Sequence, residues 1–275
     1  MHRFFLPNLQ QPVLAADEAH HAIHVLRLKA GDTVNVFDGR GHEAQAQIAD
    51  ITKDSVRLAV LHHSNAPFLP CHITLAQAIP KKSMDLIVQK ATELGVASIV
   101  PLLSERTLVQ LDGDSKRIER WREIALDACK QCGNNWLPDI QPPQKAREFM
   151  GNLGKTAPRP RGERLREGQF DLKLIASLQP DAQPLKQILS TAFTPLGAGP
   201  ALHGSRRSST EAEHSISSSV LLLIGPEGDF TPAELSLAKS VGCVPLSLGP
   251  LVLRAETAAL YALSILHHEL QNTRT

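Results

Sequence analysis

The most constraining feature of this sequence is a buried strand that runs directly into a glycine- and proline-rich loop and then into a capped helix. The strand, Val220–Ile224, is apolar throughout and is followed by Gly-Pro-Glu-Gly-Asp-Phe at 225–230. Thr231 and Glu234 then have the spacing of a capping box, with proline at the first helical position. A strand, a tight turn and a helix in this order predict a ligand pocket at the carboxyl end of the strand.

The same element occurs again further along the chain. A second strand, Val244–Leu248, runs into Gly249-Pro250, and a long, mostly apolar helix extends to Gln271. Two such loops at neighbouring strand ends are placed to hold one ligand. Neither loop has the Gly-x-Gly-x-x-Gly or Gly-Lys-Ser/Thr pattern, which argues against a phosphate-cradling loop.

Strands and helices alternate from residue 71 onward. His72–Ile79 and Ser98–Leu103 are typical of strands, and Ser83–Leu94 between them has its apolar residues on one helical face. Leu172–Leu178 is a further buried strand, and a second amphipathic helix surrounds Trp121. This alternation predicts an α/β fold with a mostly parallel sheet over residues 71–275.

Residues 1–70 show a different pattern: apolar and polar residues alternate with the period of two that is typical of strands, on both sides of a turn at Asp38–Gly41. They predict a small β-barrel or curled sheet that includes one helix, Asp17–Leu28. Pro67 and Pro70 mark the boundary between the two domains. Two stretches of the second domain, at about 151–170 and 195–219, are rich in Gly, Pro, Ser or Arg and are interpreted as insertions, with an RNA contact as a further interpretation of the first.

Composition excludes several classes of protein. The 275 residues carry a net charge of only +1, so any contact with nucleic acid must be a local patch. No apolar run approaches the roughly 20 residues of a membrane helix, and the N-terminus lacks a signal-peptide core. We therefore expect a cytoplasmic protein with no membrane partner.

Four scattered cysteines are too few for a disulfide framework in a chain of this length. Cys129 and Cys132 form a lone Cys-x-x-Cys without a second pair of ligands, so no metal is expected and both are interpreted as residues of a buried helix face. Arg254 and Glu256 are charges between an apolar loop and an apolar helix, where charge is costly unless it is paired or used. A structural Arg–Glu pair and a catalytic role both remain open on this pattern.

Several motifs together resemble one family. Leu-Ile-Gly-Pro-Glu-Gly (223–228), Ser-Leu-Gly-Pro (247–250) and Leu-Arg-Ala-Glu-Thr-Ala-Ala-Leu (253–260) resemble the knot motifs of the SPOUT methyltransferases, particularly the 16S ribosomal RNA uracil-N3 methyltransferases. Further matches are Arg-Phe-Phe-Leu (3–6), His-Val-Leu-Arg-Leu-Lys (24–29), Gln-Lys-Ala-Thr-Glu-Leu-Gly-Val (89–96), Pro-Leu-Leu-Ser-Glu-Arg (101–106) and Ala-Cys-Lys-Gln-Cys-Gly (128–133). The resemblance covers nearly the whole chain apart from the two insertions.

The resemblance implies a PUA-like RNA-binding barrel over 1–70 and a trefoil-knotted methyltransferase domain over 71–275. It also implies a homodimer, S-adenosylmethionine as the cofactor, and methylation of a uridine N3 in 16S ribosomal RNA, for which we favour the assembled small subunit as the substrate. By the same resemblance, the cofactor-binding residues are Leu178, Gly225, Pro226, Glu227, Gly228, Ser247, Leu248, Gly249 and Leu253.

Removal of the uracil N3 proton leaves negative charge on the ring oxygens, which a positioned cation stabilises. Arg254 is the candidate for that role, and Glu256 is the candidate to orient it or to assist proton removal. The base must be single-stranded or flipped, with its backbone held by cations. The candidate RNA contacts are Arg3, Arg27, Lys29, Lys81, Lys82, Arg106 and Lys130.

Several positions depart from the family pattern, among them Asn134, Trp136 and Ser177–Pro180, and three others raise the question of function. Asp229 stands where glycine is usual, Leu251 where arginine is usual, and Ala255 where threonine is common. They leave two alternatives: a non-catalytic RNA-binding or ribosome-assembly factor, and a knotted methyltransferase that acts on another RNA. A nucleotide-dependent enzyme of ordinary doubly wound fold is disfavoured, because its phosphate-binding loops are missing.

Overall fold

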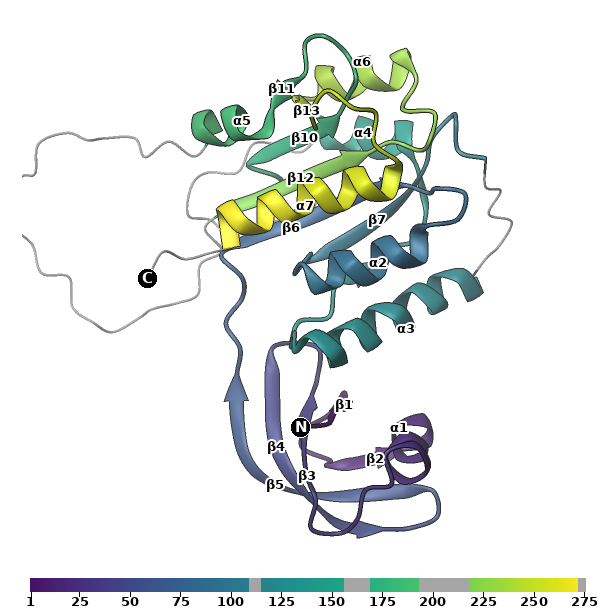
Figure 1. Ribbon diagram of the computed structural model, residues 1–275, viewed down its shortest axis with the longest axis vertical. Helices are drawn as coiled ribbons and strands as arrows, with labels where there is room; N and C mark the ends of the chain where they lie inside the picture. The colour runs from purple at the N-terminus through teal and green to yellow at the C-terminus, as the bar shows by residue number, and fades with distance from the viewer. Residues whose placement is uncertain (109–114, 156–168, 193–217, 272–275) are drawn as a thin grey trace, which may run out of the picture. The chain divides into compact units, whose positions relative to one another are not determined.

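The computed structural model describes residues 1–108, 115–155, 169–192 and 218–271 (Figure 1). The chain divides into two compact units, which are treated separately below. Unit 1 comprises Met1–Phe68, Val88–Ala97 and Gly113–Ile140; unit 2 comprises Leu69–Ile87, Ser98–Asp112 and Gln141–Thr275. Helix α2 (Met84–Glu93) contributes residues to both.

Unit 1 is built around a five-stranded sheet of order β1-β3-β4-β5-β2, which confirms the β-rich prediction for the N-terminal region. Strand β1 runs parallel to β3, and the other neighbours are antiparallel. Alternate residues such as Val34 and Ala46 are fully buried and pack together in one core. The strands are β1 (Arg3–Phe5), β2 (Val13–Ala15), β3 (Thr33–Phe37), β4 (His42–Ile51) and β5 (Ser55–Asn65).

The helix predicted at Asp17–Leu28 is shorter in the structure and changes its pitch. It begins as α1 (Ala16–His20) and continues as one π-helical turn, η1 (His21–Val25). Arg27 then adopts a φ of 55°, in the left-handed region. A residue in this conformation cannot continue a right-handed helix, so the prediction was wrong about the last turn.

Unit 1 also holds helix α3 (Ser115–Cys132) and the short strand β8 (Asp139–Ile140). After α3, Trp136 stacks on Phe68 with ring centroids 3.6 Å apart, and its indole N–H donates to the carbonyl of Ala66 at 3.2 Å. Gly41 lies under the indole ring, where a Cβ would come within 2.2 Å of a ring carbon. Close approach therefore requires glycine at this position.

Unit 2 contains a sheet in which β6, β12, β10, β13 and β11 are successive neighbours, with β7 on the other side of β6. All these pairs are parallel, as the sequence predicts. β9 also pairs with β7 in parallel. The strands are β6 (Cys71–Ala78), β7 (Ser98–Leu103), β9 (Gln144–Lys145), β10 (Leu172–Ala176), β11 (Gln183–Pro184), β12 (Ser218–Ile224) and β13 (Val244–Ser247).

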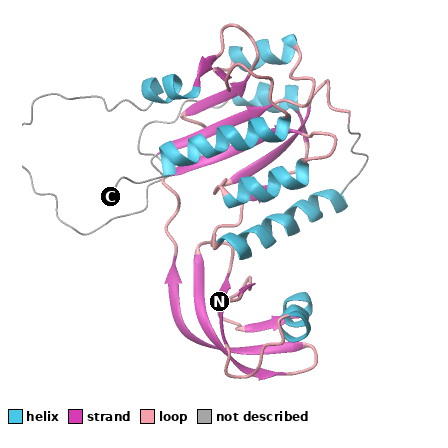
Figure 2. Ribbon diagram, in the orientation of Figure 1, coloured by secondary structure: helices cyan, strands magenta, loops and turns pink. Residues whose placement is uncertain are grey.

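Helices cover both faces of this sheet (Figure 2). Leu221 and Leu223 of β12 pack in one core with α4 (Ala146–Leu153) and α6 (Pro232–Ser240), while α7 (Ala255–Gln271) contacts β6 and β12. Six successive residues of β12, from Ser219 to Ile224, have no more than 1% exposure because neither face meets solvent. Helix α5 (Leu185–Ala192) follows β11.

Most of the two predicted insertions lies outside the described residues. Within the described residues, α4 continues to Leu153, and β12 begins at Ser218. None of the described helices is long and apolar enough to cross a membrane.

Candidate functional site

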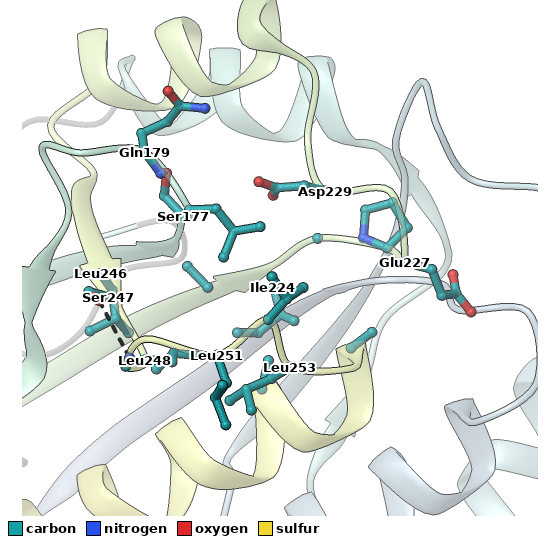
Figure 3. A pocket seen from close by; sticks show the side chains of 18 of the residues that line it. Ser177, Gln179, Ile224, Glu227, Asp229, Leu246, Ser247, Leu248, Leu251 and Leu253 are labelled. Carbon is teal, nitrogen blue, oxygen red and sulfur yellow. Dashed lines mark hydrogen bonds between the residues drawn. The ribbon is translucent and has the colours of Figure 1, made fainter.

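Three loops meet at one edge of the unit 2 sheet because they follow three neighbouring parallel strands, β13, β10 and β12. Between them lies a cavity of about 320 Å³ (Figure 3). This volume is within the range of small-molecule sites, about 300–1,000 Å³. Its walls are Ala176–Gln179, Ile224–Glu227, Asp229, Leu246–Leu253, Ala255 and Ala258.

The loop after β10 is tied to its neighbouring strand. The N–H of Ser177 donates to the carbonyl of Leu246 at 3.0 Å, and the hydroxyl of Ser177 accepts the N–H of Gln179 at 3.2 Å. These bonds hold the turn against β13 and place Leu178, which is 60% exposed, at the rim of the cavity.

The loop after β12 folds back on itself. The N–H of Asp229 donates to the carbonyl of Pro226 at 2.9 Å, and Asp229 has a φ of 60°. A Cβ on Gly225 would approach the Asp229 carboxylate to 3.1 Å and the N–H of Phe230 to 3.2 Å. Glycine at 225 therefore allows this tight return, and the side chain of Asp229 is left facing the cavity (Figure 3).

Glu234 anchors the same loop to the rest of unit 2. Its side chain is fully buried, and one carboxylate oxygen accepts both the N–H (2.9 Å) and the hydroxyl (3.1 Å) of Thr231. The other oxygen accepts the N–H of Glu105 at 3.0 Å. The predicted capping box is therefore confirmed, and it also connects the loop after β7 with the loop after β12.

The loop after β13 depends on a glycine conformation and presents apolar side chains. Gly249 has a φ of 112°, and its N–H lies 3.4 Å from the hydroxyl oxygen of Ser247. Leu251 and Val252 are 73% and 77% exposed although both line the cavity. This wall is therefore apolar and open at its rim.

The charged side chains in the cavity wall are two carboxylates, Glu227 and Asp229. Glu227 points away from the cavity in Figure 3, and it accepts the backbone N–H of Lys81 at 2.9 Å. The pKa of Asp229 is raised, chiefly by burial and also by nearby Glu234, against the opposing effects of the Phe230 and Leu178 N–H groups and of Arg106. The described lining has no cationic side chain, so it suits a ligand without phosphate groups.

The structure brings eight of the nine predicted cofactor residues into this one wall. Gly228 lies outside it, and its carbonyl accepts a hydrogen bond from Arg106 at 2.5 Å. The prediction missed Ser177 and Gln179 as wall residues and treated Asp229 only as a departure from the family. A signal for Ser177 and Gln179 was available. Ligands bind beyond the carboxyl ends of parallel strands, and both residues lie at the carboxyl end of the strand predicted at 172–178.

The two candidate catalytic residues stand beside the cavity rather than in its wall. Arg254 is exposed and its carbonyl accepts the N–H of Ala258, the first bond of α7. Glu256 is half-buried in the first turn of that helix, where its carboxylate accepts the hydroxyl of Ser83 at 2.9 Å. An acidic group is favourable at a helix N-terminus.

The candidate RNA contacts fall into two groups. Two are engaged within unit 1: Arg3, 13% exposed in its side chain, pairs with Glu43, and Lys130, 19% exposed, pairs with Glu18. The others are exposed at the surface, namely Arg27, Lys29, Lys81, Lys82 and Arg106.

The cysteines do not form a ligand set. Cys129 is buried, and burial raises its pKa to about 12, whereas Cys132 is exposed. The interpretation that both lie on a buried helix face was therefore wrong for Cys132. Within the described residues, no group of three or more His, Cys, Asp or Glu side chains is arranged to hold a metal ion.

Comparison with known proteins defines the class. Residues 67–267 match the model of the RNA methyltransferase domain, and residues 14–61 match that of the RNA methyltransferase PUA domain. The chain is therefore an RNA methyltransferase with an N-terminal PUA domain and an α/β domain that carries the cavity.

Relatives narrow the class to one family. The chain is 31% identical to ribosomal RNA small subunit methyltransferase E of Synechocystis, over 91% of this chain and 71% of that protein, and 28% identical to the Bacillus subtilis protein of the same name, over 100% and 99%. A solved structure of ribosomal RNA small subunit methyltransferase E from Neisseria gonorrhoeae, bound to S-adenosyl methionine, is 28% identical with a TM-score of 0.74, covering 98% of this chain and 97% of that one. The protein belongs to the ribosomal RNA small subunit methyltransferase E family.

Proposed function

We propose that this protein transfers a methyl group from S-adenosylmethionine to N3 of a uridine in 16S ribosomal RNA. The observation that carries the proposal is the cavity beyond three neighbouring parallel strands, since it gathers eight predicted cofactor residues in a member of this family. The relatives' names supply the class of substrate, and the family resemblance supplies the ring position.

The cavity suits this cofactor in size and chemistry. Apolar side chains from Leu246 to Leu253 offer contact surface for an adenosyl group, and Gly249 leaves open space where a side chain would otherwise stand. The absence of cationic side chains in the described lining fits a cofactor that has a positive charge and no phosphate. When bound, S-adenosylmethionine supplies an electrophilic methyl group on a sulfonium.

Arg254 acts on the uracil ring in this proposal. It is exposed, it follows a wall residue directly, and it stands at the start of α7. The guanidinium stabilises the negative charge that develops on the ring oxygens as N3 loses its proton. Removing one such electrostatic contact typically lowers the rate by about 10²–10³.

Glu256 is the candidate to orient Arg254 or to take up the N3 proton. Ser83 donates its hydroxyl hydrogen to one carboxylate oxygen and so fixes the orientation of this side chain. We therefore expect loss of the Ser83 hydroxyl to lower turnover and to leave the cavity wall unchanged.

RNA is bound by exposed cations in each domain, with the PUA-like barrel assigned to residues 1–70 and the methyltransferase domain to 71–275. Arg27 and Lys29 serve the first domain, and Lys81, Lys82 and Arg106 the second. Because phosphate contacts release counterions, binding weakens as salt concentration rises. Arg3 and Lys130 contribute less, since each is held in an ion pair.

The protein acts as a cytoplasmic homodimer on the assembled small ribosomal subunit in this proposal. The exposed apolar side chains of Leu178, Leu251 and Val252, all in the cavity wall, support a surface that a partner covers. A substrate site composed by folded RNA accounts for target selection by a chain whose net charge is only +1.

The test is transfer of labelled methyl from S-adenosylmethionine to small subunits that lack the modification, followed by nucleoside analysis. We expect 3-methyluridine, and an Arg254→Ala rate lowered about 10²–10³-fold with cofactor affinity retained. Lys145→Ala, which removes an exposed positive charge of the same unit, is the matched control.

Other outcomes identify the alternatives. RNA binding without methyl transfer would indicate a non-catalytic assembly factor, for which the departures at Asp229, Leu251 and Ala255 give a reason. Transfer to a different RNA, or a different methylated nucleoside, would place the chemistry on another substrate. Full turnover by Arg254→Ala would show that the residue has no catalytic role.

A further inference from the structure

Asp229 is held in the cavity wall by a backbone conformation that is uncommon for its residue type. Its φ of 60° lies in the left-handed region, which glycine adopts freely and aspartate adopts at some cost. Two hydrogen bonds maintain this conformation: the N–H of Asp229 to the carbonyl of Pro226 (2.9 Å) and the N–H of Phe230 to the Asp229 carboxylate (2.7 Å). The carboxylate is thereby fixed in position before any ligand arrives.

The position of this carboxylate is inside the site. Figure 3 shows it directed towards the loop of Ser177 and Gln179, whereas the Glu227 side chain points away. Arg106 is the nearby cation, but its guanidinium donates to the carbonyl of Gly228 and its side chain is not part of the wall. Glu234, on α6, adds a second negative charge nearby.

We propose that Asp229 distinguishes the charged cofactor from its neutral product, favouring a sulfonium over the thioether that remains after methyl transfer. The inference rests on the proposed function and deepens it by assigning a specificity-determining residue. S-adenosylmethionine and S-adenosylhomocysteine share their adenosine and amino-acid groups and differ in the methyl group and the charge on sulfur. A carboxylate in the cavity wall attracts the cation and gains nothing from the neutral sulfur.

The charge of the Asp229 carboxylate sets the expected difference in affinity between the charged cofactor and the neutral product. At separations near 4 Å, the attraction between a partly solvated carboxylate and a cation corresponds to about 5–20-fold in affinity once solvent screening is allowed for. Weaker retention of the product assists its release, because the same residue that favours the charged cofactor does not hold the neutral one.

The experiment measures dissociation constants by calorimetry for three ligands: S-adenosylmethionine, S-adenosylhomocysteine and sinefungin, which has an amine-bearing carbon in place of the sulfonium and transfers no methyl group. Asp229→Asn is the principal variant, because asparagine tolerates a positive φ and retains an acceptor oxygen. Asp229→Gly is the second variant, which removes the side chain and any backbone strain. Asp181→Asn is the control; Asp181 pairs with Lys239 at 2.6 Å in the same unit and outside the wall.

We expect both Asp229 variants to bind the two cationic ligands about 5–20-fold more weakly, while the affinity for S-adenosylhomocysteine changes less than about twofold. The control variant should match the wild type for all three. An equal loss for all three ligands would overturn the inference, since the carboxylate would then contact a shared group such as the α-ammonium. Unchanged affinities would overturn it as well. A wild-type protein that binds none of the ligands would instead refute the proposed cofactor and, with it, this role.

Discussion

Replacement of Glu234 by alanine should destabilise unit 2 more than any loss of a simple helix cap. The fully buried carboxylate accepts three hydrogen bonds, two from Thr231 and one from the N–H of Glu105. Loss of the cap costs about 1 kcal/mol. Leaving the inward N–H of Glu105 without an acceptor costs about 1–3 kcal/mol more. We therefore expect Glu234→Ala to lower the free energy of unfolding by about 2–4 kcal/mol.

Two matched variants separate these contributions. Thr231→Ala removes the cap hydroxyl and leaves the contact with Glu105, so it should cost about 1 kcal/mol. Glu234→Gln keeps one carbonyl oxygen and should fall between the two. For a unit of 150–250 residues each kcal/mol lowers Tm by about 2–4 °C, which gives a decrease of about 4–16 °C for Glu234→Ala.

The assay is urea denaturation or calorimetry, with far-UV circular dichroism as the spectroscopic signal. Tryptophan fluorescence is unsuitable for unit 2, because Trp121 and Trp136, the two tryptophans of the sequence, both lie in unit 1. If Glu234→Ala costs no more than Thr231→Ala, the bond to Glu105 contributes nothing and the reasoning is wrong.

Three further substitutions test other parts of the structure. Gly41→Ala should destabilise unit 1 by about 2–4 kcal/mol, because the new Cβ clashes with the Trp136 ring and the φ of 92° disfavours alanine. The measurement is tryptophan fluorescence in urea. Gly31→Ala, at a similar φ but with open space around it, should lose only the smaller amount of stability that comes from the backbone conformation. Gly249→Ala, at a φ of 112°, should weaken cofactor binding by about tenfold in calorimetry by reshaping the loop, and unchanged affinity would contradict this. Asp229→Asn should raise the Tm of the ligand-free protein at pH 7, because burial raises the pKa of that carboxyl and the folded state therefore takes up the proton at higher pH than the unfolded state. The difference in Tm should disappear as pH falls below about 4, where both states are protonated. A difference that persists there would contradict this cause.

The sequence predicts those elements whose signal is local. The strand at Val220–Ile224 and the capped helix after it appear as expected, because apolar runs and capping residues act over a few positions. The helix over Asp17–Leu28 was placed correctly at its start but not at its end, since no local signal indicated the left-handed conformation of Arg27.

Features that depend on which strands become neighbours were not accessible in the same way. The rule for carboxyl ends of parallel strands points to the loop that contains Ser177, but no periodicity encodes the placement of β10 between β12 and β13, which brings that loop beside the other two. Arg3 is one of the cations predicted as candidate RNA contacts, and the fold pairs it with Glu43, a partner that the sequence pattern did not indicate. Pairings over such sequence separations emerge only from the tertiary structure.

The cavity wall is assembled from segments that lie far apart in the order of synthesis. Residues 176–179 form one part of it, 224–227 with 229 a second, and 246–253 with 255 and 258 a third; the stretch 193–217 lies between the first part and the other two. A nascent chain that has not yet emerged beyond residue 246 lacks one of the three loops, even if its first strands are already paired. Cofactor binding therefore becomes available only late in synthesis, and capture on an immobilised cofactor analogue would select chains in which all three loops are present.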